Sequence, residues 1–198
     1  MSAVLAIICG VLVVGIDQLT KYLVTVFMEP NEVIAVIPHI INFNRIPPNT
    51  GAAFGIFQGQ TWFLITVTCV IMIICVGMLI RKTFESRCMF WALCLVLGGG
   101  IGNLIDRVFR GGHVVDFLEF GFFEFPVFNV ADIAVCVGAG LILLCLHVRK
   151  WRSEEYQQRC PKCGNMTNAN GSSSGMRQAG GGYIHNYHCK SCGHKWSN

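Results

Sequence analysis

Long apolar runs alternate with short polar stretches up to about residue 150. A helix needs about 20 apolar residues to cross a bilayer, and four runs meet that length. The second run carries no charge, and the first lacks the basic leader of a secretory signal and holds its polar residues late. We therefore predict four transmembrane helices, with Ala3–Val26, Trp62–Ile80, Cys88–Ile105 and Phe125–Val148 as their segments.

Basic residues gather at one set of helix ends and predict the orientation. Arg81, Lys82 and Arg87 lie between the second and third spans, and further bases follow the fourth. Lys and Arg favour the cytoplasmic side of a membrane, so both termini are expected in the cytoplasm. Two loops, 27–61 and 106–124, then face outward, and the β-branched segment Glu32–Ile46 predicts short strands in the first.

Composition supports a membrane protein. The chain is 53% hydrophobic and 13% charged, with a mean hydropathy of +0.54, whereas soluble domains are about a quarter charged. The net charge of +4 is not gathered into one broad basic patch, and no nucleic-acid partner is predicted.

The tail after Trp151 is polar, rich in Gly and Ser, and holds two Cys-x-x-Cys pairs. Each pair is followed by Gly, which is typical of the two knuckles of a zinc ribbon. A disulfide pair or a redox dithiol fits less well, because the tail follows the fourth span into the reducing cytoplasm. We predict one structural Zn²⁺ held by Cys160, Cys163, Cys189 and Cys192. The other seven cysteines lie in the spans and are interpreted as packing residues.

Two aspartates, Asp116 and Asp132, lie in a strongly apolar stretch without a base within one helical turn. Ionisable residues at membrane depth are candidates for function. If the two carboxylates meet, they cannot both ionise easily and will share a proton. Such a pair suits acid–base hydrolysis; the alternative is a cation or proton site in a carrier.

Other polar residues fall at the same predicted level. Asp17 and Lys21 are spaced to pair on one helix face. Asp106 and Arg107 occupy either this layer or a solvated helix end, and Asn129 is expected on the helix face of Asp132, where it would orient the pair. The glycines of "GGGIG" before Asn103 predict close helix packing.

Five blocks in order resemble those of lipoprotein signal peptidases (signal peptidase II), which are aspartic peptidases of bacterial inner membranes. They are "DQLTK", "NTGAAF", "GGGIGNLIDR", "GHVVDF" and "FNVAD", and the resemblance runs from Met1 to about Lys150. It implies that Asp116 and Asp132 are the catalytic dyad. It also implies a substrate-binding or supporting role for Asp17, Lys21, Asn49, Gly51, Asn103, Asp106, Arg107 and Asn129.

The resemblance further implies the substrate and the location of the cut. The substrate would be a prolipoprotein whose Cys carries diacylglycerol, cut just before that Cys near the outer face of the membrane. The cut needs no metal, and cyclic peptides of the globomycin type are expected inhibitors. The ribbon is outside the usual family pattern, and its cytoplasmic partner is not identified.

The predicted fold is an all-α polytopic membrane protein with four transmembrane helices, a small extracytoplasmic β element and a zinc ribbon. Its predicted parts are a peptidase domain over 1–150, a linker over 151–159 and the ribbon over 160–198. Two rival functions remain at this point. One is an ion- or proton-coupled carrier, although no internal repeat is seen; the other is an inactive membrane anchor for a ribbon adaptor.

Overall fold

We analysed a computed structural model of the chain, which describes residues 3–51, 56–81, 86–155, 157–168, 186–189 and 191–197. The chain divides into two compact units, Met1–Cys145 and Leu146–Asn198. Residues 52–55 of the first outward loop, the base Lys82 and residues 169–185 of the Gly/Ser-rich tail are among those outside the described residues.

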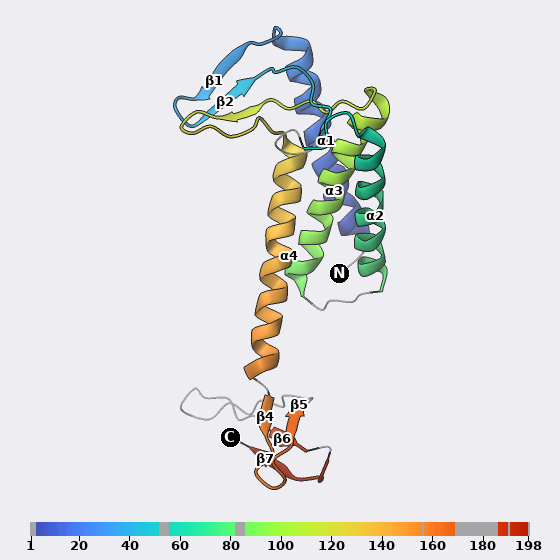
Figure 1. Cartoon of the computed structure of the whole chain (residues 1–198), viewed down its shortest axis with the longest axis vertical. Helices are drawn as coiled ribbons and strands as arrows, with labels where there is room; N and C mark the ends of the chain where they lie inside the picture. Colours follow the sequence, from blue (N-terminus) through green and yellow to red (C-terminus); the bar gives the residue numbers. More distant parts are fainter. Residues whose placement is uncertain are drawn as a thin grey trace. The chain divides into compact units, whose positions relative to one another are not determined.

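Four helices dominate the first unit (Figure 1): α1 (Ala3–Phe27), α2 (Thr61–Ile80), α3 (Arg87–Phe109) and α4 (Val130–Glu155). Within the described residues, four helical segments are long and apolar enough to cross a membrane. They are Ile7–Phe27, Thr61–Ile80, Arg87–Phe109 and Val130–Val148. The predicted multi-pass helical fold is confirmed.

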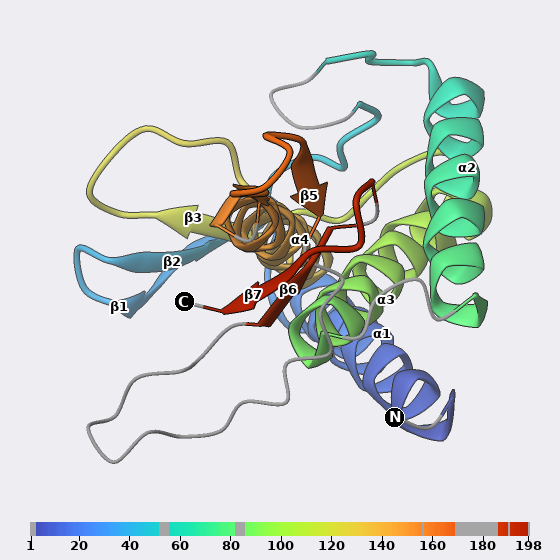
Figure 2. The ribbon, with the colours of Figure 1, turned by 90° about the horizontal axis from the view of Figure 1, so that it is seen from below.

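The glycines of α3 let two other helices approach its backbone closely (Figure 2). A Cβ at Gly98 would lie 2.8 Å from Val13 Cβ of α1, and one at Gly102 would lie 2.6 Å from Asp17 Oδ2. A Cβ at Gly99 would clash with the backbone oxygen of Ala131 in α4. The predicted role of this glycine run in close packing is confirmed.

A small antiparallel sheet extends from the end of the helices that holds the predicted site (Figure 1). Its order is β1 (Val33–Ile37), β2 (Ile41–Asn44) and β3 (Leu118–Phe120). The two strands predicted near the start of the first loop are confirmed, whereas β3 was not predicted. Phe117 is buried beside Val24 and Met28 of the α1 end, which attaches the sheet to the helices.

The fourth helix begins later than predicted, at Val130 rather than Phe125. The reason is that Phe128 pairs with Leu118 through two backbone hydrogen bonds of 2.9 and 2.8 Å, so the chain is extended up to Asn129. The third helix ends later than predicted, at Phe109, which places Asp106 and Arg107 inside its last turns.

The second unit contains two short hairpins. Strand β4 (Gln157–Arg159) pairs with β5 (Met166–Asn168), and β6 (Asn186–His188) pairs with β7 (Lys195–Ser197). The segment 151–159, predicted to be a linker, consists of the end of α4 and strand β4, with residue 156 outside the described residues.

Candidate active site

One asparagine joins the two candidate carboxylates through its side-chain and backbone N–H groups. Asn129 Nδ2 donates to Asp116 Oδ1 at 2.6 Å, and the backbone N–H of Asn129 donates to Asp132 Oδ2 at 3.1 Å. Asp116 comes from the loop before β3, and Asp132 lies in the first turn of α4. The tertiary structure therefore brings the two aspartates to one site.

The spacing of Asn129 and Asp132 is that of a helix N-cap, not of two residues on a helix face as predicted. Asn129 precedes the first helical residue, and its Oδ1 accepts from the backbone N–H of Asp132 at 2.9 Å. Asp132 Oδ2 accepts in return from the N–H of Asn129. This reciprocal pair is a capping box, and the helix N-terminus favours negative charge at Asp132.

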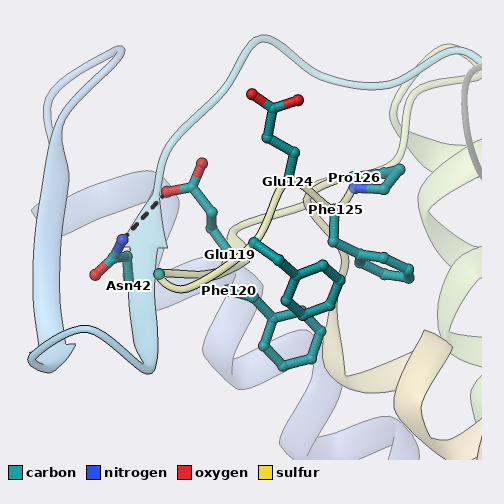
Figure 3. A pocket seen from close by; sticks show the side chains of 8 residues that line it. Asn42, Glu119, Phe120, Glu124, Phe125 and Pro126 are labelled. Carbon is teal, nitrogen blue, oxygen red and sulfur yellow. Dashed lines mark hydrogen bonds between the residues drawn. The ribbon is translucent and has the colours of Figure 1, made fainter.

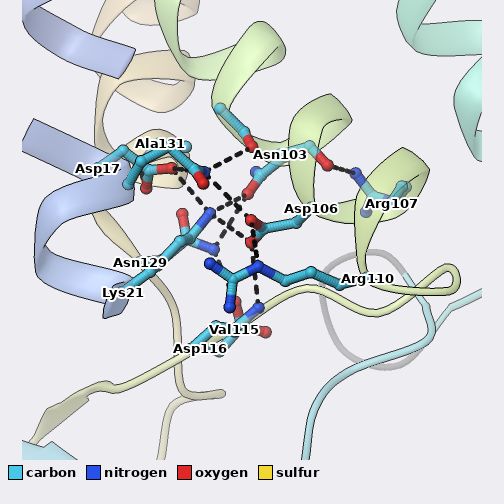
Figure 4. Close-up of polar contacts among 12 residues, drawn as sticks. Asp17, Lys21, Asn103, Asp106, Arg107, Arg110, Val115, Asp116, Asn129 and Ala131 are labelled. Atoms are coloured by element: carbon cyan, nitrogen blue, oxygen red, sulfur yellow. Dashed lines mark hydrogen bonds and ion pairs between the residues drawn. The ribbon is translucent and has the colours of Figure 1, made fainter. Parts of the chain in front are cut away.

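Asn103 in α3 connects the pair to a buried cation (Figure 4). Its Nδ2 donates to Asp132 Oδ1 at 2.7 Å. Its Oδ1 accepts from Asn129 Nδ2 at 3.2 Å and from Lys21 Nζ at 3.0 Å. The amide orientation of Asn103 is therefore fixed by donors on one side and an acceptor on the other.

Lys21 is fully buried and lies between two carboxylates. Its Nζ is 2.8 Å from Asp17 Oδ2 and 2.9 Å from Asp106 Oδ2. The predicted pairing of Asp17 with Lys21 is confirmed. Asp106 is also fully buried, so the solvated helix end is excluded for this residue.

Two further residues of this network were missed by the sequence analysis. Gln18 Nε2 donates to Asp17, to Asp106 and to the backbone oxygen of Gly102, each at 3.1 Å. Arg110 Nε is 3.2 Å from Asp106 Oδ1. The spacing of Asp106 and Arg110, one helical turn apart, was the available signal for that ion pair.

The same network fixes the start of α4. Asp17 Oδ1 accepts from the backbone N–H of Ala131 at 2.9 Å. This N–H is one of the first-turn donors that have no partner within the helix. An ion pair on α1 thus positions the helix that carries Asp132.

The loop before α2 closes the other side of the site. Asn49 Nδ2 donates to Asp116 Oδ2 at 3.1 Å, and Asn49 Oδ1 accepts from the N–H of Gly51 at 2.8 Å. Arg107 Nη2 donates to the backbone oxygen of Gly51 at 3.1 Å, while its buried Nε has no partner among the described residues. All eight supporting residues named above therefore belong to one hydrogen-bonded layer.

The electrostatics of this layer favour one bound proton. Burial raises the pKa of Asp116 to about 6, and the charge of Asp132 adds to the rise, while hydrogen bonds from Asn49 and Asn129 oppose it. The layer holds four carboxylates (Asp17, Asp106, Asp116 and Asp132) against three cations (Lys21, Arg107 and Arg110). A single proton on the Asp116–Asp132 pair balances these charges.

A second cluster lies in the tail. The four Sγ atoms of Cys160, Cys163, Cys189 and Cys192 lie within 4.8 Å of one another. Two contacts, Cys160–Cys192 and Cys163–Cys189, measure 3.6 Å. Zn–S bonds of about 2.3 Å place tetrahedral sulfurs about 3.8 Å apart, so these thiols fit Zn²⁺.

The backbone of each Cys pair is shaped for such a site. Gly164 and Gly193 have φ of +72° and +71°, a conformation that favours glycine. Their N–H groups donate to the carbonyls of Cys160 and Cys189 at 2.9 and 2.8 Å. The two turns thus have the same geometry, which positions both thiols of each pair.

Comparison with known proteins places the first unit in a family. The family model described as "Signal peptidase (SPase) II" matches residues 9–148. The chain is 45% identical over 132 residues to a lipoprotein signal peptidase of Brevibacillus brevis, covering 67% of this chain and 87% of that protein. It is 44% identical over 140 residues to one of Shouchella clausii, covering 71% and 91%.

Two solved structures are also similar, and both are titled as bacterial membrane enzyme structures by the in meso method. One, at 2.3 Å resolution, has a TM-score of 0.72 and 34% identity and covers 80% of this chain and 95% of that chain. The other, at 1.9 Å, has a TM-score of 0.66 and 36% identity and covers 73% and 93%. The family match ends before the cysteine cluster.

Proposed function

The chain belongs to the signal peptidase II family of aspartic peptidases, and from this premise we propose that it removes the signal peptide from diacylglyceryl-modified prolipoproteins. The cut falls just before the lipidated Cys. The observation that carries the proposal is the hydrogen bonding of Asn129 to both Asp116 and Asp132 within a buried layer. These two aspartates are the proposed catalytic residues.

The chemistry follows from one proton held by two carboxylates. The ionised carboxylate takes a proton from water, and the water oxygen bonds to the scissile carbonyl carbon. The protonated carboxyl group donates its hydrogen to the carbonyl oxygen. When the C–N bond breaks, the proton taken from water passes to the amine of the leaving Cys, and the other returns to the pair.

The supporting residues have two proposed roles. Asn49 and Asn129 orient Asp116, while Asn103 and the capping box orient Asp132. Arg107, whose buried Nε has no partner among the described residues, stabilises the negative charge of the layer and donates to the bound peptide backbone. We propose that cyclic peptides of the globomycin type bind at the same polar layer.

The experiment is a cleavage assay with purified protein in detergent and a diacylglyceryl-modified prolipoprotein. We expect Asp116→Asn and Asp132→Asn to lower the rate by on the order of 10³-fold or more, because either change removes the shared proton. Each variant should keep its unfolding temperature within a few degrees. A folded variant with near-normal cleavage would exclude the dyad.

The proposed location is the bacterial inner membrane, with both termini in the cytoplasm and the site near the outer face. The support is the pair of bases at the facing ends of α2 and α3, with Arg81 directly after α2 and Arg87 at the start of α3. A fluorescent protein that folds only in the cytoplasm, fused after Asn198, should be fluorescent. A fused alkaline phosphatase at the same point, which is active only outside, should be inactive.

For the tail, 160–198, we propose one structural Zn²⁺ bound by the four cysteines. Bound zinc would join two hairpins that are far apart in sequence. The cut itself is expected to proceed without metal, because the two carboxyl groups provide both acid and base. The ribbon is then proposed to bind a cytoplasmic partner, which is not identified.

The alternative of an inactive anchor for a ribbon adaptor has no support from the comparisons, and the carrier is set aside because the chain belongs to a peptidase family. Deletion of residues 160–198 distinguishes a peptidase from a ribbon adaptor. A peptidase should keep cleavage after the deletion, whereas an adaptor would lose its activity.

A further inference from the structure

The three-stranded sheet exposes apolar side chains although it lies outside the spans. Strand β1 (Val33–Ile37) is an edge strand with all five residues exposed, including Ile37 at 49%. A flat apolar edge in water promotes pairing with other chains and is normally blocked by charge or proline. The sequence of β1, "VIAVI", contains neither.

The loop after β3 exposes aromatic rings in the same way. Phe122 is 64% and Phe123 47% exposed. The rings contact one another and Phe120 rather than a core, with the centroids of Phe120 and Phe123 stacked at 5.1 Å. These residues therefore form a surface cluster of rings.

This loop is amphipathic (Figure 3). The rings of Phe120 and Phe125 lie on one side of it, and the carboxylate of Glu124 extends to the opposite side. These residues, with Phe123, line an open hollow of about 680 Å³. An aromatic face opposed by a carboxylate is typical of a segment at a boundary between apolar and aqueous phases.

The two apolar segments meet at one end of the sheet. The N–H of Gly121 donates to the backbone oxygen of Ile40 at 3.0 Å. A Cβ at Gly121 would lie 3.1 Å from the carbonyl carbon of His39, so the two turns are in close contact. We call the exposed residues at this end the apolar tip: Val36, Ile37, Ile40, Phe122, Phe123 and Phe125.

The apolar tip is connected along the chain to the ends of two spans, α1 and α4. Helix α1 ends at Phe27, which is 76% exposed, and β1 begins shortly after it. On the other side, Phe128 pairs with Leu118 immediately before the cap of α4. The exposed apolar surface of the sheet therefore begins where the lipid-facing surface of the helices ends.

We propose that the apolar tip inserts into the lipid leaflet at this end of the helices, at the boundary between headgroups and acyl chains. The Phe and β-branched side chains of the tip bury apolar area there, while Glu124 remains in water. Strand β3 and the loop that carries the rings connect Asp116 to Asn129 along the chain. Insertion would thus hold both sides of the polar layer at a fixed depth.

The test uses the full chain in bilayer nanodiscs of phosphatidylethanolamine and phosphatidylglycerol, in which some lipids carry a diazirine near the start of the acyl chain. After illumination, mass spectrometry locates the adducts. We expect lipid adducts at residues 36–40 and 122–125. Labelling of these residues only by a water-soluble carbene reagent would overturn the proposal.

Two variants separate insertion from a general loss of structure. Phe122→Asp with Phe123→Asp should lower lipid adducts at the tip several-fold, whereas Phe122→Leu with Phe123→Leu should retain them. Adducts on the lipid-facing side of α2 serve as the internal standard in both. Equal labelling of the Asp and Leu pairs would contradict insertion.

The alternative partner for the apolar tip is a second copy of this chain. Protein–protein cross-links at the tip in place of lipid adducts would exclude the lipid proposal. None of these measurements uses cleavage, so they remain informative even if the proposed dyad is wrong.

Discussion

The polar layer of the first unit and the cysteine cluster of the second both gather side chains that are distant in sequence. They differ in how the gathered groups are held. In the layer, each carboxylate has amide, backbone or cationic partners from several elements. In the cluster, four thiols face one another on two small hairpins.

Of the two sites, only the polar layer is organised before its ligand binds. Apart from the Nε of Arg107, the side chains of the layer bind partners within the protein, so the geometry of the proposed site is preorganised. The two hairpins have strands of only three residues each, and a tail of this size rarely supplies a stable core without a metal or disulfide. Zinc would therefore fold the tail, whereas the layer needs only the packing of the helices.

Removal of the metal should have the most different effects on the two regions. Binding of structural zinc contributes about 10 kcal/mol or more to small zinc domains, so Cys163→Ser or a strong chelator should unfold the tail. Zinc per chain, measured by mass spectrometry, should fall from one to about zero. Cleavage of the lipidated substrate should stay within a factor of about two, because residues 160–198 lie outside the family match.

Serine substitution of Cys136, an exposed cysteine of α4, is the matched control for that experiment. It should change neither zinc content nor cleavage. If the chelator stops cleavage and zinc restores it, the two regions are not independent.

Loss of the buried cation should damage the layer alone. Lys21→Met leaves Asp17 and Asp106 buried without their shared partner, and breaking a buried pair in this way costs about 3–5 kcal/mol. We expect a large drop in the thermal unfolding temperature in detergent, with the zinc content unchanged. An unchanged unfolding temperature would show that Lys21 is not the central cation.

Acid should stabilise the first unit over one pH window. The pKa of Asp116 is raised to about 6 in the folded chain, against about 3.9 in an unfolded one. The folded state therefore holds more protons between these values, and stability from this residue falls as pH rises from about 4 to about 6. The total change is on the order of 2–3 kcal/mol.

Unfolding followed at several pH values in that window tests this expectation, and Asp116→Asn should give a flatter profile. Cleavage should also fall as pH rises through about 6, because Asp116 then loses its proton and a doubly ionised pair has no acid. An Asp116→Asn profile as steep as that of the wild type would assign the pH effect to another group.

The smallest expected effect comes from the helix contact at Gly102. A Cβ there would lie 2.6 Å from Asp17 Oδ2, and forced overpacking costs about 1–3 kcal/mol. Gly102→Ala should therefore destabilise the first unit and lower cleavage. Gly10→Ala in α1 is the control, because nothing lies within 4 Å of its Cβ position; it should be neutral or raise stability by up to about 1 kcal/mol.

Local patterns predicted much of this molecule. The spans follow from apolar runs, and the Cys knuckles from spacing within a few residues. The pairing of Asp17 with Lys21 joins residues one helical turn apart and was also predicted. The two aspartates were singled out by their apolar surroundings and by the family resemblance, although their catalytic role stays a prediction.

Other features depended on contacts between distant elements. Asn129 was expected on a helix face, but the pairing of Phe128 with Leu118 keeps the chain extended up to this residue and makes Asn129 the helix cap. Strand β3 forms only because β2 lies beside it. The role of Gln18 needed the approach of α1 to α3.

The sequence by itself determined the membrane-spanning helices, their basic ends and the spacing of the paired cysteines, because hydropathy and short spacings act over a few residues. Only the tertiary structure decided that Asn129 joins Asp116 to Asp132, that Lys21 bridges Asp17 and Asp106, and that the apolar tip is one surface. Those contacts arise when glycine-lined helices pack closely and an extended loop is paired in register, and neither condition is local to the residues it brings together.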